Sequence, residues 1–112
     1  MKKVWHKGLT KERWEKYGLN AQMANIGAEV GRAINWRKKG DLEYSRDAFF
    51  RALELVDLTI EVHRGDIPKL KELTRLREVL GDYFMGDNQY GSSDELWEKY
   101  FYPFNYAARV SC

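Results

Sequence analysis

The side chains best suited to proton transfer or metal binding in this 112-residue chain are its two histidines and the carboxylates near them. A carboxylate di-iron site in a helical bundle places a glutamate three residues before a histidine, but Ile60 occupies that position before His63. Asp57 and Glu61 are one helical turn apart, on a face where solvated carboxylates are more common than general acid/base catalysts. His6 lies in an N-terminal segment without periodicity, and His63 lies near a helix end, where the helix dipole favours its charged form. The sequence predicts no catalytic residue and no metal site.

A polar loop at residues 86–95 has the oxygen-rich side chains and the glycines of many ligand-binding loops. It lacks the alternating ligands and the final glutamate of a calcium-binding loop, and no lysine follows its glycines as in a phosphate-binding loop. Turn and cap residues account for it without a ligand, because Ser92 and Glu95 have the spacing of a capping box and predict a helix from Ser93. We therefore expect a turn here, with no cofactor.

Aromatic residues are concentrated between Tyr83 and Tyr106. One helical face carries four rings that we expect in the core, against the small residues Gly27 and Gly31: Trp97, Tyr100, Phe101 and Phe104. The remaining tyrosines are expected to be exposed and, with an arginine near the C-terminus, form the predicted binding surface, which consists of Tyr90, Tyr102, Tyr106 and Arg109. Tyrosine and arginine are enriched at protein interfaces, and the simplest partner is a second copy of the chain. Such rings could also line a small-ligand pocket under the loop, and the sequence does not separate that arrangement from a filled core.

Stacked rings near basic residues also bind single-stranded nucleic acid, but most basic residues lie at the other end of the sequence, so a protein interface is favoured at the tyrosines. The basic N-terminal third provides an alternative, RNA-binding surface. Its candidate phosphate contacts are Lys2, Lys3, Lys7, Lys11, Arg13 and Lys16. The first half of the chain has an excess of lysine and arginine and the second half an excess of acids, although the net charge is only +2. A helical bundle brings the two halves together, so part of this asymmetry would cancel in space.

The elements that must position these residues are helices, since apolar residues recur every three or four positions. Residues 1–9 are expected to form an arm with Trp5 as its anchor, followed by a short helix capped by Thr10 and stopped by Gly18. Three long helices are then predicted over residues 19–39, 42–63 and 67–86, separated by Gly40-Asp41 and Gly65-Asp66.

The first two long helices should form an antiparallel hairpin because the turn at Gly40 is tight. In the second, we expect Leu42 on the buried stripe and a fully exposed line formed by Glu43, Asp47, Glu54, Asp57 and Glu61. The last helix should kink or stop near Pro103, which has no backbone donor.

These elements predict one domain over residues 1–112, an all-α, up-and-down bundle of four main helices with a short extra N-terminal helix. The longest stretch without charge, residues 17–28, is too short to span a membrane. Cys112 is the only cysteine, so an internal disulfide is excluded, and no apolar export signal is present, so we expect a cytoplasmic protein.

Two family resemblances add expectations. Residues 26–58 resemble a single tetratricopeptide hairpin, with Ala33, Gly40, Asp41, Phe49, Ala52, Leu53 and Leu55 at its small, turn and apolar positions. This hairpin occurs once, so we interpret it as a way of packing two helices rather than as part of a repeat array.

The layout of the whole chain, about four helices in little over a hundred residues, resembles the HEPN class of small helical bundles. That class includes ribonucleases and non-catalytic partners of nucleotidyltransferases, which are often dimeric. Its nuclease motif has an arginine four to six residues before a histidine, whereas Leu58 and Thr59 precede His63 and Arg64 follows it. The resemblance therefore implies a non-nucleolytic member. We expect a non-enzymatic, homodimeric interaction module or, alternatively, an RNA-linked or nucleotidyltransferase-partner protein.

Overall fold

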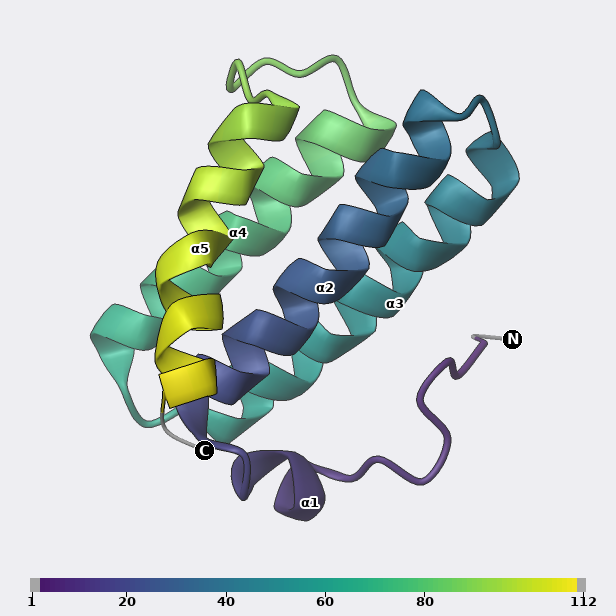
Figure 1. The fold of residues 1–112 in the computed structure, drawn as a ribbon. Helices are drawn as coiled ribbons and strands as arrows, with labels where there is room; N and C mark the ends of the chain where they lie inside the picture. The colour runs from purple at the N-terminus through teal and green to yellow at the C-terminus, as the bar shows by residue number, and fades with distance from the viewer. Residues whose placement is uncertain (1–2, 111–112) are drawn as a thin grey trace.

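The structure, a computed structural model, describes residues 3–110, which form helices and no strand (Figure 1). The helices are α1 (Lys11–Glu15), α2 (Gly18–Lys38), α3 (Leu42–Val62), α4 (Ile67–Met85) and α5 (Asp94–Val110). Consecutive long helices run in opposite directions, and the segment before α1 extends along the outside of α3 (Figure 1). The chain is therefore all-helical, as predicted.

Most helix ends are set by the residues that the sequence indicated. The side chain of Thr10 accepts a hydrogen bond from the Arg13 amide at 3.2 Å, and Asp41 accepts one from the Tyr44 amide at 3.0 Å. Gly40 has a φ of +84°, which favours glycine and allows the sharp turn between α2 and α3. These caps satisfy amide groups that have no partner within their helices, so the predicted starts of α1 and α3 are confirmed. The prediction that Gly18 stops the first short helix is wrong, because α1 already ends at Glu15 and Gly18 is the first residue of α2.

The predicted capping residue of the last helix and its predicted stop near Pro103 are wrong. The side chain that caps α5 is Ser93, which accepts a hydrogen bond from the Leu96 amide, whereas the Ser92 amide donates to Asn88 in the preceding loop. The helix also continues past Pro103 to Val110. Pro103 is exposed, so the carbonyl that loses its helical partner lies on the solvent side of α5, where water can replace the missing donor.

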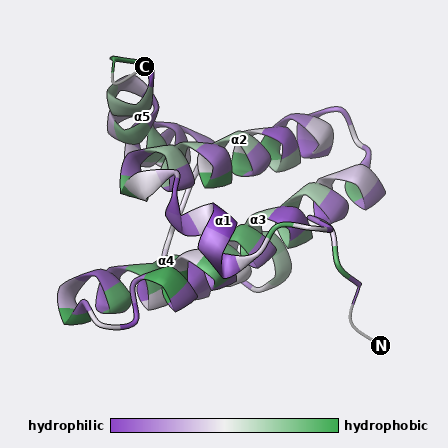
Figure 2. Ribbon diagram, turned by 90° about the horizontal axis from the view of Figure 1, so that it is seen from below, coloured by the Kyte–Doolittle hydropathy of each residue, from purple (hydrophilic) through white to green (hydrophobic). Residues whose placement is uncertain are grey.

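The long helices form two layers. Figure 2, seen from below, shows α2 and α5 in one layer and α3 and α4 in the other. α2 packs against both α3 and α5, α3 packs against α4, and α1 packs mainly against α3. The largest fully buried apolar side chains lie between the layers: Met23, Ile26, Phe49, Leu73 and Leu80.

The faces of α2 and α3 differ from expectation at several positions. Leu42, the first residue of α3, is 63% exposed, so its prediction as a buried residue is wrong. Of the line predicted to be fully exposed, only Glu43 is exposed. Asp47, Asp57 and Glu61 are half-buried, and the N-terminal segment covers Glu54. Phe101 packs on Gly27 as predicted, but no atom would lie within 4 Å of a Cβ at Gly31.

Within residues 3–110, no helix is long and apolar enough to cross a membrane.

Candidate functional site

The outer face of α5 carries three of the four residues predicted to bind a partner. A Cβ atom on Gly27 would lie only 2.8 Å from the ring of Phe101, so α5 packs tightly on α2 and Phe101 points inward. Tyr102 and Tyr106 therefore point outward, and they are 60% and 54% exposed. Arg109 is also exposed, one turn after Tyr106. The structure thus brings these three residues onto one helix surface.

Tyr90 lies elsewhere, in the loop at the opposite end of α5 (Figure 1). Its hydroxyl donates to Glu78 at 2.6 Å, a bond that raises the pKa of Tyr90, and its amide donates to Asp82 at 3.0 Å. The guanidinium of Arg75 lies 5.5 Å from the centre of its ring. Tyr90 is therefore exposed as expected, but it does not join Tyr102 and Tyr106.

The beginning of α5 is fixed by a polar contact between three helices. Asp94 accepts a hydrogen bond from the Tyr83 hydroxyl and forms ion pairs with Arg37 at 3.2 Å and Lys38 at 3.9 Å. The Arg37 guanidinium also lies 4.5 Å from the centre of the Tyr83 ring. Burial and the bond to Asp94 raise the pKa of Tyr83. This contact holds α2, α4 and α5 together beside the loop.

The structure gathers part of the predicted basic surface. Lys7, Arg13 and Lys16 line a hollow of about 480 Å³ together with Leu9 and the exposed ring of Tyr17.

Two other basic candidates, Lys3 and Lys11, do not line this hollow. The ammonium of Lys3 lies 4.1 Å from the centre of the Trp5 ring. Lys11 is near Glu61, whose pKa is lowered chiefly by its hydrogen bond from Arg64 and further by Lys11. Lys2 lies outside the described residues.

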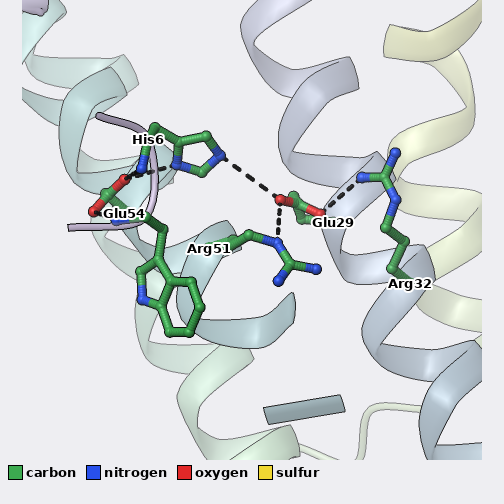
Figure 3. Close-up of polar contacts among 6 residues, drawn as sticks. His6, Glu29, Arg32, Arg51 and Glu54 are labelled. Carbon is green, nitrogen blue, oxygen red and sulfur yellow. Dashed lines mark hydrogen bonds and ion pairs between the residues drawn. The ribbon is translucent and has the colours of Figure 1, made fainter. Parts of the chain in front are cut away.

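A polar cluster that the sequence did not indicate joins the N-terminal segment to α2 and α3 (Figure 3). Glu54 accepts hydrogen bonds from the Trp5 amide at 2.9 Å, the His6 amide at 2.6 Å and the His6 ring at 2.7 Å. Glu29 is 7% exposed and pairs with Arg32 at 2.7 Å and Arg51 at 2.8 Å. The second ring nitrogen of His6 faces Glu29 at 3.7 Å.

The chemistry of this cluster is that of an anchor. Burial alone would raise the pKa of Glu54, but the hydrogen bonds from Trp5 and His6 outweigh it and lower that pKa. Because Glu54 accepts from the His6 ring, Nδ1 of His6 must carry a proton. Arg32 and Arg51 donate to the two carboxylate oxygens of Glu29, one each. Trp5 was the only sequence signal for this anchor, since its other members lie far apart along the chain.

His63 differs from its prediction. Its ring nitrogen Nε2 is 2.9 Å from the side-chain oxygen of Gln22, whose amide nitrogen donates to the carbonyl of Trp14. Burial lowers the pKa of His63, and the nearby charge of Lys69 lowers it further. The neutral form of His63 is therefore favoured, whereas the sequence suggested the charged form.

Among the described residues, no group of three or more His, Cys, Asp and Glu side chains could hold a metal ion. Comparison with protein-family models, curated proteins and solved structures finds no match to this chain.

Proposed function

We propose that this protein is a non-enzymatic cytoplasmic interaction module that forms a homodimer through the outer face of α5. In this proposal α2 to α5 act as an up-and-down four-helix bundle, with α1 as an additional helix. The observation that carries the proposal is the pair of exposed rings on one face of a rigid helix, Tyr102 and Tyr106. Exposed tyrosines are enriched at protein interfaces.

The charges beside these rings favour a second copy as the partner. Glu98, Tyr102, Tyr106 and Arg109 are spaced by three or four residues and so share one face of α5. Neither Glu98 nor Arg109 forms an ion pair with a described residue. If two α5 helices meet antiparallel and centred near residue 104, Glu98 of each faces Arg109 of the other and Tyr102 faces Tyr106. This face is therefore self-complementary, as a two-fold interface requires.

The interface would be small. The 17 residues of α5 extend over about 25 Å, so contact along this helix alone is at the lower end of the areas of specific complexes. We therefore expect reversible association, to be followed by analytical ultracentrifugation from about 1 µM to about 1 mM, a range that covers association free energies of about −8 to −4 kcal/mol.

Replacing both Tyr102 and Tyr106 by serine should weaken dimerisation by more than about thirtyfold, because truncation of one hot-spot side chain costs about 2 kcal/mol. The matched control is Tyr44→Ser, which removes a tyrosine of the same 54% exposure from α3. Equal dimerisation of the double variant and the control, at unchanged helicity, would refute the proposal.

A charge exchange tests the antiparallel arrangement. Arg109→Glu alone should weaken the dimer, because it places two acidic groups opposite each other, and Glu98→Arg in the same chain should restore it. Failure of the second substitution to restore association would exclude this pairing, although not dimerisation through the tyrosines.

The second candidate function is an RNA-linked role, including that of a HEPN-like partner of a nucleotidyltransferase. It is favoured by the hollow in which Lys7, Arg13 and Lys16 surround the exposed ring of Tyr17, since cations with an aromatic ring are what single-stranded RNA contacts. Binding of a uridine oligonucleotide of about 12 nucleotides should weaken with salt, with a logarithmic slope of about −2 for three phosphate contacts.

The triple variant Lys7→Gln, Arg13→Gln and Lys16→Gln should abolish this binding. A control with three glutamines at Lys39, Arg46 and Lys71, which are exposed elsewhere, should retain it. Binding that is lost equally in both variants would reflect net charge alone and would remove this candidate.

A further inference from the structure

A cavity separates α4 from α5. The tight contact of Phe101 with Gly27 draws α5 toward α2, whereas no Cα atom of α4 lies within 8 Å of one in α5. Aromatic side chains span part of this gap, with the rings of Tyr83 and Trp97 6.3 Å apart. The remaining cavity has a volume of about 350 Å³, within the range of small-molecule sites.

The wall of this cavity is apolar with a few polar groups, as in most ligand sites. Its lining residues are Glu72, Arg75, Leu76, Val79, Tyr90, Trp97 and Tyr100.

One of these side chains has an unpartnered hydrogen-bond donor. Trp97 is 5% exposed, and its indole nitrogen is the only buried side-chain nitrogen or oxygen of the described residues without a hydrogen-bond partner. The other fully buried tryptophan, Trp14, donates its indole N–H to Thr59 at 2.8 Å. Buried donors are almost always paired in folded proteins, so this unpaired indole N–H is unusual. Because the nitrogen itself is shielded from solvent, the cavity meets Trp97 at its ring carbons.

Two further donors in the wall also have no protein acceptor. Tyr100 makes ring contacts but no hydrogen bond with a described residue, and burial, with the charge of Glu72, raises the pKa of Tyr100 to about 12. Its hydroxyl therefore remains a donor at neutral pH. Arg75 lies over Tyr90 and forms no ion pair with a described residue. The cavity thus offers neutral and charged donors beside aromatic and aliphatic surfaces.

We propose that this cavity binds a small aromatic carboxylate, whose ring packs between Leu76, Val79 and the ring of Trp97. Its carboxylate supplies the acceptors that Arg75 and Tyr100 lack, and carboxylate bonds to arginine are the stronger, charge-assisted kind. Glu72 lies in the same wall and repels this group, so the two charged residues should affect binding in opposite directions. The site is independent of the outer face of α5 and of its proposed dimerisation.

The test follows the four tryptophan indole N–H signals in ¹H–¹⁵N NMR spectra during titration with benzoate up to about 20 mM, since ligands of this size bind weakly. The Trp97 signal is assigned by Trp97→Phe or, if that variant fails to fold, by elimination with Trp5→Phe, Trp14→Phe and Trp36→Phe. Benzoate should shift the Trp97 signal and leave the Trp14 signal unchanged, and neutral benzamide should bind more weakly.

Arg75→Gln should weaken benzoate binding about tenfold, Glu72→Gln should strengthen it, and Lys71→Gln, which removes a charge from α4 outside the cavity, should leave it unchanged. Benzylamine should not bind. No shift of the Trp97 signal with benzoate, or a shift with benzylamine in its place, would overturn the proposal. Equal effects of Arg75→Gln and Lys71→Gln would do so as well.

Discussion

The contact between Gly27 and Phe101 sets the position of α5, and a single methyl group should test it. A Cβ atom at residue 27 would lie 2.8 Å from Cγ, 2.9 Å from Cδ1 and 2.9 Å from Cβ of Phe101. Because Cβ is fixed to the backbone, rotation of the Phe101 ring cannot relieve the overlap. Gly27→Ala must therefore displace α5 from α2.

The expected change in the free energy of unfolding of Gly27→Ala follows from two opposing effects. Overpacking of a tight contact costs about 1–3 kcal/mol, whereas alanine is about 1 kcal/mol better than glycine inside a helix. Gly31→Ala, one turn later in the same helix, gains the propensity without the overlap, since no atom lies within 4 Å of its added Cβ. The difference between the two variants should therefore be the overpacking term alone, about 1–3 kcal/mol.

The assay is urea unfolding followed by circular dichroism, with thermal unfolding as a second measure. Gly31→Ala should be more stable than the wild-type protein and Gly27→Ala less stable than Gly31→Ala, with melting temperatures that differ by at least about 4 °C. If both alanines stabilise the protein equally, α2 and α5 are not in close contact at Gly27, and the inference that this contact opens the gap to α4 fails.

Two further predictions concern ionisable side chains. Glu54→Gln should destabilise the protein by about 1–3 kcal/mol at pH 7, because charged hydrogen bonds anchor Trp5 and His6. Since the pKa of Glu54 is lowered from 4.5, the stability that its charge contributes is present above that pH and is lost as the pH falls through the folded-state pKa. Urea unfolding from pH 7 to pH 3 should therefore show the stability difference between Glu54→Gln and the wild-type protein shrinking. Glu43→Gln, on the exposed side of α3, should have little effect at any pH. Tyr100, with a pKa of about 12, should favour folding below pH 10 and lose that contribution as the pH rises from 10 toward 12. Ultraviolet titration should therefore give Tyr100→Phe and the wild-type protein the same tyrosinate absorbance at pH 11, and a smaller absorbance in the variant would contradict the burial of Tyr100.

The helices and most of their ends could be predicted from the sequence because each depends on residues only a few positions apart. Thr10 and Asp41 cap helices through amides three residues away, and Gly40 supplies the turn between two of them. The inward and outward faces of α5 follow from the helical period in the same way, which is why Phe101 was correctly predicted as buried and Tyr102 as exposed. Ser92 was misjudged because Asn88 in the loop competes for its amide.

Only the tertiary structure decided how distant residues combine. Glu54 has no local pattern that separates it from the other acidic residues of α3, and it is covered because His6, 48 positions earlier, binds it. The gap beside Trp97 arises from the unequal packing of α5 against two helices, which no single helix encodes. The basic segment around Arg13 and the C-terminal end of α5, at opposite ends of the sequence, lie at the same end of the bundle (Figure 1). Helices and their ends depend on residues a few positions apart along the chain. The combination of distant residues depends instead on which helix surfaces meet and, at Gly27, on how closely a small residue lets α5 approach α2.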